Sequence, residues 1–140
     1  MTEREIYTLI AQYLQVKYPQ AIYRFDLAAD MKLTPGQARR HKELHPFRGY
    51  PDLFIAEPAP RCLDGSWNHE YNGLFLEIKK GGTRIKKKNG EWANQHIREQ
   101  ADMLERLEFR GYRAAFAVGF DEATKIIDDY FQSILSYEEI

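Results

Sequence analysis

Apolar residues recur at every third or fourth position in three segments of the chain, a spacing typical of amphipathic helices. The first segment follows Thr2, a predicted N-cap, and should end near residues 18–19. The second spans about residues 92–110 and should stop at Gly111. The third follows Asp121, which we expect to cap it. The pattern therefore predicts three long helices, one at the start of the chain and two in its last third.

Four other segments have the composition of strands. Residues 21–27 alternate apolar and polar side chains, which is typical of a half-buried strand. Residues 52–56, 73–79 and 112–118 are short apolar runs, which predict buried strands.

A short polar helix is predicted between the first and second strands. Thr34 is its expected N-cap, Pro35 lies in its first turn, and His45 precedes the proline that ends it. Residues 57–72 contain prolines and show no clear period, so we expect a loop there. The order of elements predicts one α/β domain over residues 1–140, with a small mixed β-sheet flanked by helices.

Composition narrows the class of protein. The 140 residues are 44% hydrophobic and 29% charged, as in an ordinary globular protein, and the net charge is −1. That charge argues against a protein that binds nucleic acid over its whole surface. Basic residues are nevertheless concentrated without an acid between positions 79 and 88: Lys79, Lys80, Arg84, Lys86, Lys87 and Lys88. Such a local cluster can bind phosphates while the molecule stays near neutral.

Two further features bear on location. No apolar stretch approaches the length of a membrane span, and the first residues lack a signal-peptide core, so we expect a cytoplasmic protein with no membrane partner. Cys62 is the single cysteine, which excludes an internal disulfide and a cysteine-based zinc site.

The candidate chemistry lies on two of the predicted core strands. Asp52 opens one of them, and Glu77 and Lys79 close the other. Charged groups are rarely buried in such runs without partners, because unpaired burial is costly. Residues two apart on a strand face the same side, so Glu77 and Lys79 should point together and Ile78 into the core. An Asp and a Glu on neighbouring strands can share a hard cation, with a Lys beside them to hold a water or an anionic oxygen, which predicts metal-dependent chemistry on phosphate.

Each motif also has a simpler interpretation. Asp52 alone fits a turn, and a Glu-X-Lys pattern alone fits an exposed strand end. Residues 86–88 fit either a solvated loop or a contact with a phosphate backbone, and the same two interpretations apply to Arg39, Arg40 and Lys42 on the short helix. The four histidines show no metal-ligand spacing and are expected to be surface or packing residues: His41, His45, His69 and His96.

The order of these motifs resembles the PD-(D/E)XK nuclease superfamily. Within it, the chain most resembles the VRR-NUC family, including the small stand-alone members of phages and bacteria. The resemblance rests on residues 49–53, residues 75–79, Gln100 with the apolar helix residues after it, and residues 114–118. It implies a restriction-endonuclease-like core.

The resemblance also implies roles for individual residues. Asp52, Glu77 and the backbone carbonyl of Ile78 would ligate Mg²⁺ or Mn²⁺. Lys79 would position the attacking water or offset charge on the phosphate, and Gln100 would support the site. A further metal-site glutamate is expected on the first helix, where Glu3 fits the pattern.

Three points stay open at this stage. Glu5 is the alternative to Glu3, although its position three residues after Thr2 fits a capping box. Gln95 replaces Gln100 if the helix has a different register. Residues 57–72 form a long insertion between the motif strands.

The function implied is that of a metal-dependent endodeoxyribonuclease selective for branched, flapped or Holliday-junction DNA. A homodimer would suit symmetric cleavage, and a phage-encoded enzyme would act in the host cytoplasm. The residues expected to contact DNA are Lys80, Arg84, Lys86, Lys87, Lys88, Arg39 and Arg40. The alternatives are an end-processing or nicking nuclease of phage replication or packaging, a non-catalytic nucleic-acid-binding domain that keeps the nuclease fold, and a structural protein with an accidental motif match.

Overall fold

The computed structural model describes residues 1–26 and 31–138, with side chains up to residue 134. Its elements in chain order are α1 (Glu3–Lys17), β1 (Tyr23–Phe25), α2 (Pro35–Leu44), β2 (Leu53–Ile55), β3 (Ala59–Leu63), β4 (Ser66–Tyr71), β5 (Leu74–Lys79), α3 (Gln95–Phe109), β6 (Arg113–Val118) and α4 (Phe120–Glu138).

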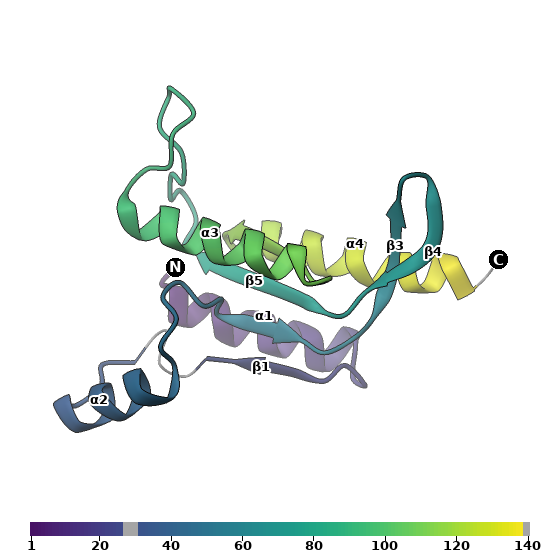
Figure 1. Cartoon of the computed structure of the whole chain (residues 1–140). Coiled ribbons are helices and arrows are strands. Elements are labelled where there is room, and N and C mark those ends of the chain that lie inside the picture. Colours follow the sequence, from purple (N-terminus) through teal and green to yellow (C-terminus); the bar gives the residue numbers. More distant parts are fainter. Residues whose placement is uncertain (27–30, 139–140) are drawn as a thin grey trace.

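Four strands form one mixed sheet in the order β1-β2-β5-β6. The β1–β2 and β2–β5 pairs are antiparallel, whereas β5 and β6 are parallel and are connected through α3. Helices flank this sheet (Figure 1). The predicted α/β class with a small mixed sheet is therefore confirmed.

The two faces of the sheet pack against different helices. Leu76 and Ile78 of β5 are fully buried in a core shared with Ile10 of α1 and Ile127 of α4. Phe75, from the opposite face of β5, joins a smaller cluster whose other buried members are Leu104 of α3 and Ala114 of β6. Because side chains alternate along a strand, Glu77 and Lys79 share the α3 face with Phe75, as the sequence predicts.

The predicted starts of the first two helices are confirmed. Thr2 caps α1, and its side chain and that of Glu5 form a reciprocal capping box. Thr34 caps α2 in the same way with Gln37. Both caps satisfy backbone N–H groups that the first helical turn leaves without partners.

The predicted loop over residues 57–72 is wrong, because β3 and β4 form a separate two-stranded hairpin there. The strands pair up to Leu63 and Ser66, and the turn between them is Asp64-Gly65. Both turn residues have positive φ, of 52° and 79°, which is the conformation of the tight turns that suit hairpins. An Asp-Gly pair between two strand-like segments is a strong hairpin signal. The prolines in residues 57–72 favoured the interpretation as a loop.

Two helix starts also differ from prediction. Helix α3 begins three residues later than expected, because Trp92 and Ala93 pair with residues 85–86 and Asn94 then caps the helix. Helix α4 begins at Phe120, so Asp121 lies in its first turn and is not the N-cap.

Strand β1 is shorter than the predicted segment 21–27, of which Leu27 lies outside the described residues. Strand β2 is likewise confined to three residues of the predicted 52–56. Within the described part of the chain, every helix is too short or too polar to span a membrane.

Candidate active site

The register between β2 and β5 brings the two candidate carboxylates together. Leu53 pairs with Leu76, and continuing this antiparallel register by one residue places Asp52 opposite Glu77. Directly opposed residues of neighbouring strands have their Cβ atoms about 4.5–5.5 Å apart. Strand pairing therefore holds two acidic side chains at the α3 face of the sheet.

Asp52 is buried and held by the backbone of the neighbouring strand. Ile78 N–H donates a 2.7 Å hydrogen bond to Asp52 Oδ2. Burial raises the pKa of Asp52, and the negative charge of Glu3 adds to this, while the hydrogen bond from Ile78 opposes it. The charge of Asp52 in turn adds to burial in raising the pKa of Tyr7, whose hydroxyl is buried near that carboxylate. The Asp52 carboxylate is thus fixed in place in an environment that disfavours its charge.

Glu77 is the more strongly perturbed of the two. Gln100 Nε2 donates a 2.8 Å hydrogen bond to Glu77 Oε1, and Lys79 Nζ lies 3.7 Å from the same oxygen. The other oxygen, Oε2, is buried without a hydrogen-bond partner. Burial raises the pKa of Glu77, the Asp52 charge raises it further, and Lys79 lowers it only in part. The Glu77 carboxyl is thus held by Gln100 at one oxygen and is coupled to the Asp52 carboxyl beside it, while Oε2 receives no hydrogen bond from an N–H donor.

These side chains lie in a cleft of about 1210 Å³. Its lining includes five of the residues that the sequence points to: Glu3, Asp52, Glu77, Lys79 and Gln100. The cleft also borders α2, which has no buried residue of its own and stands apart from the sheet in Figure 1. The sheet and α3 provide the floor of the cleft, and α2 with the segment after it provides a wall.

The structure distinguishes the alternatives for two positions. Glu3 lines the cleft, whereas Glu5 is exposed and bonded to the Thr2 backbone. Gln100 is buried against Glu77, whereas Gln95 is exposed at the start of α3. The structure thus brings Gln100 to Glu77, places Glu3 in the same cleft, and leaves Glu5 and Gln95 outside.

The predicted DNA-contacting residues occupy two exposed segments. Residues 80–94 form an ordered finger that projects beyond the start of α3 (Figure 1). Its turn is closed by a 2.8 Å hydrogen bond from Lys87 N–H to the Glu91 carbonyl, and Lys86 Nζ lies 4.8 Å from the centre of the Trp92 ring. Lys80, Arg84, Lys86, Lys87 and Lys88 are all exposed on the finger. Arg39 and Arg40 are exposed on α2.

Two residues near the carboxylates were not predicted as site residues. His96 lines the cleft, and its Nε2 lies 3.3 Å from Gln100 Nε2. Its position four residues before Gln100 on the same helix is the signal that could have identified it. Gly49 has a φ of +75°, and a Cβ there would lie 2.8 Å from the carbonyl oxygen of Glu99. This close approach packs the segment that leads to Asp52 directly against α3.

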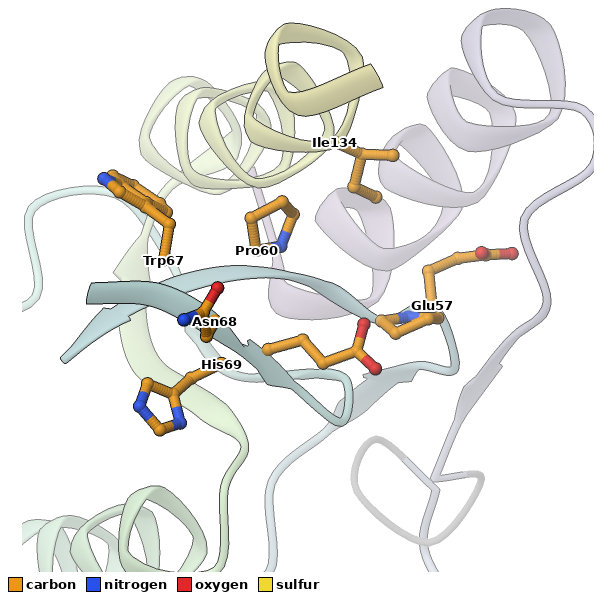
Figure 2. A pocket seen from close by; sticks show the side chains of 8 residues that line it. Glu57, Pro60, Trp67, Asn68, His69 and Ile134 are labelled. Atoms are coloured by element: carbon orange, nitrogen blue, oxygen red, sulfur yellow. The ribbon is translucent and has the colours of Figure 1, made fainter. Parts of the chain in front are cut away.

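A second cavity, of about 540 Å³, lies between the hairpin and α4. Figure 2 shows Trp67 and Pro60 of the hairpin on the side of Ile134 of α4. This cavity shares no lining residue with the cleft. It therefore takes no part in the arrangement around Asp52 and Glu77.

The carboxylate pair fits a hard divalent cation. The fit rests on the buried Glu77 Oε2, which lacks a partner, beside a second buried carboxylate. Oxygen ligands of this kind are those that Mg²⁺ and Mn²⁺ prefer. Among the described residues, no three His, Cys, Asp or Glu side chains gather closely enough to hold a metal, so Glu3 lines the cleft without completing such a group.

Comparison of the structure with solved structures gives a match over nearly the whole chain. A "VRR_NUC domain protein" superposes with a TM-score of 0.60 and 26% sequence identity, covering 95% of this chain and 90% of that one. The chain has the VRR_NUC fold. The resemblance expected from the sequence is thus confirmed in three dimensions. No protein-family model matches the chain, and no curated protein sequence matches it.

Proposed function

We propose that this VRR_NUC-fold protein is a Mg²⁺- or Mn²⁺-dependent endodeoxyribonuclease that cuts branched, flapped or four-way DNA. The observation that carries the proposal is the buried pair of Asp52 and Glu77, with one Glu77 oxygen free of hydrogen bonds. A protein that only binds DNA has no need for two buried carboxylates in a cleft, because carboxylates repel phosphate. A bound cation would compensate the charge that burial disfavours.

Asp52 and Glu77 would hold the cation, with the carbonyl of Ile78 and a contribution from Glu3 as further candidates. When bound, such a cation lowers the pKa of a water and neutralises charge on a phosphate oxygen. Asp52 is already oriented by the Ile78 N–H, and Glu77 by Gln100. Preorganised ligands of this kind lose little freedom on binding.

Lys79 and Gln100 complete the site by different means. Lys79 places a positive charge beside Glu77 at the edge of the cleft, where it can attract a phosphate oxygen and orient a water. Gln100 contacts no phosphate in this proposal. It acts as a positioning residue, because its amide fixes one Glu77 oxygen and leaves the other for the cation.

The two basic segments extend the binding surface beyond the site. The finger carries five exposed cations, and α2 carries Arg39, Arg40 and Lys42. Such point charges bind the phosphate backbone without reading sequence. Selectivity for DNA structure over DNA sequence is consistent with this distribution.

The test is incubation of the purified protein with end-labelled linear, flapped and four-way DNA, in Mg²⁺, Mn²⁺ or EDTA. The proposal predicts cleavage with either metal, a preference for the flapped or four-way substrate, and no cleavage in EDTA. Asp52→Asn and Glu77→Gln should each slow cleavage by orders of magnitude.

The matched control is Glu122→Gln, an equally conservative change at an exposed glutamate of α4, which should cleave like the wild type. Cleavage by Glu77→Gln at the wild-type rate would show that the activity comes from a contaminant or another site. DNA binding without cleavage under any metal condition would favour the non-catalytic alternative. Sedimentation of the protein with and without four-way DNA tests the proposed homodimer.

A further inference from the structure

The cleft above the carboxylates has an apolar wall that phosphate chemistry does not use. Four large apolar or aromatic side chains line it and are still about half exposed: Met31 (53%), Leu44 (56%), Phe47 (59%) and Tyr50 (50%). Isolated exposed apolar residues are ordinary, but several in one cleft mark a binding surface. Neither a metal ion nor a phosphate gains from contact with them.

Phe47 is the aromatic ring best placed to receive a ligand on this wall. It lies in the segment between α2 and β2, and the guanidinium carbon of Arg106 from α3 sits 5.2 Å from the centre of its ring. The ring is therefore supported by α3 through a cation–π contact. More than half of its surface stays accessible, and it lines the cleft.

Tyr50 is a second ring in the same cleft, only two residues before Asp52 in the chain. Its ring meets Phe75 edge-on, with 5.7 Å between centroids. Gly49, packed against α3, and the buried Pro51 fix the backbone on either side of it. Tyr50 is thus held near the carboxylates while half of its surface remains open.

The charges of the cleft indicate what covers these rings. Lys79 and Arg24 line the same space together with Glu3, Asp26 and the two carboxylates that the proposed cation would neutralise, and α2 carries Arg39 and Arg40 on its exposed surface. A nucleotide matches this combination, because it joins an anionic phosphate to a flat apolar base. A second copy of the chain matches it less well, because it would bring two basic α2 helices together.

We propose that the cleft binds an unpaired nucleobase, stacked on Phe47 and Tyr50, next to the phosphate at Asp52 and Glu77. The inference rests on the proposed nuclease function and names its substrate class as DNA with unpaired nucleotides beside the cut. A base inside a continuous duplex has both faces covered by its neighbours, so it cannot stack on a side chain without leaving the helix. Base–aromatic stacking is also tolerant of sequence, as structure-selective binding requires.

The experiment measures binding with Ca²⁺ in place of Mg²⁺, so that a hard cation balances the charges of Asp52 and Glu77, and denaturing gels verify that no strand is cut. The probes are a duplex with a short single-stranded gap that carries 2-aminopurine, and a fully paired duplex of the same length. Wild-type protein should bind the gapped DNA more tightly and quench the 2-aminopurine fluorescence. Phe47→Ala should weaken binding to the gapped DNA by between about 5-fold and about 150-fold, the range expected for one stacked base, and should leave the paired duplex unaffected.

Two further variants control for general damage. Phe47→Trp keeps a ring and should preserve both the affinity and the quenching. Phe109→Ala removes a ring that is 92% exposed and does not line the cleft, and it should behave like the wild type. Circular dichroism of each variant verifies folding.

Three outcomes would overturn the inference. These are equal losses on both probes, no loss on either, and binding without any quenching in the wild type. Loss of a wild-type dimer in Phe47→Ala, with unchanged DNA binding, would assign the wall to a contact between copies. The nuclease proposal fails on a different measurement. It would be contradicted by the absence of metal-dependent cleavage, whatever the binding experiment shows.

Discussion

Gln100 Nε2 donates a 2.8 Å hydrogen bond to Glu77 Oε1, and this contact joins α3 to the carboxylate face of the sheet. Both side chains are buried. The bond occupies one oxygen of Glu77 and leaves Oε2 without a partner. The contact thus determines which Glu77 oxygen is available to a ligand.

Removing the amide should therefore disturb the site. We expect Gln100→Ala to lower the single-turnover cleavage rate by about 10- to 100-fold, as is typical when a residue that orients a metal ligand is lost. The control is Gln95→Ala on the same helix, at an exposed position. Equal cleavage rates for the two variants would show that Gln100 does not support the site.

Glu77 should cost the protein stability at neutral pH in the absence of metal. Burial and the Asp52 charge raise its pKa above the ordinary value of 4.5. The folded state then binds more protons than the unfolded state as the pH rises above 4.5, so this group makes the free energy of unfolding decrease with pH. Glu77→Gln lacks that penalty and keeps an oxygen that can accept from Gln100. In EDTA at pH 7, we expect the free energy of unfolding of Glu77→Gln to exceed that of the wild type by more than about 1 kcal/mol.

The measurement is urea denaturation of both proteins between pH 3.5 and 8. The stability difference should grow with pH above about 4.5 and vanish below it. A variant that is less stable than the wild type at pH 7 would show that the Glu77 charge is already well compensated.

Asp128 should show the opposite pH dependence, far from the cleft. Partial burial acts to raise its pKa, but hydrogen bonds from Tyr13 and Tyr18 and the Lys17 ammonium outweigh this and lower the pKa below 3.8. Tyr18 Oη lies 2.6 Å from Asp128 Oδ1, and Lys17 Nζ lies 3.0 Å from the same oxygen. Its stabilising contribution is therefore present above pH 3.8 and is lost as the pH falls through the lower folded-state pKa.

Asp128→Asn should lower the free energy of unfolding at pH 7 by about 1–2 kcal/mol, because the charge-assisted hydrogen bonds that tie α1 to α4 are weakened. The neighbouring change Asp129→Asn, at an exposed carboxylate that forms a surface ion pair with Lys125, should cost less than about 0.5 kcal/mol. Equal losses in denaturant melts would contradict a special role for Asp128.

The finger should contribute to DNA affinity through charge alone. Replacing Lys86, Lys87 and Lys88 with Ala should weaken binding to all DNA structures by similar factors. It should also reduce the slope of log affinity against log salt by up to about three, roughly one per lost phosphate contact. The rate at saturating DNA should change little. An unchanged salt slope, measured beside Lys125→Ala as a control, would place the DNA path along Arg39 and Arg40 of α2.

The sequence predicted where the candidate residues lie better than it predicted their surroundings. Strand alternation alone was enough to put Glu77 and Lys79 on one face, because the period of two is a local property. The hairpin at Asp64-Gly65 was also predictable from its turn residues, although the prolines around it led to the prediction of a loop. The cleft wall at Phe47 was not predictable, since no local pattern distinguishes an exposed aromatic that lines a cleft from one that packs in the core.

Tyr7 illustrates the same limit. Its spacing on α1 fits an ordinary core residue, and its ring does stack on Phe25 with 5.3 Å between centroids. The charge of Asp52 also raises the pKa of the Tyr7 hydroxyl, and this effect depends on how α1 crosses the sheet. Such relationships come from tertiary packing and not from periodicity.

The central claim is that Asp52 and Glu77 together bind a divalent cation, and calorimetric titration of the protein with Mn²⁺ tests it most directly. The account predicts saturable binding to the wild type and to Glu122→Gln, and loss of that binding in both Asp52→Asn and Glu77→Gln. Unchanged Mn²⁺ binding in both carboxylate variants, with folding verified, would contradict it.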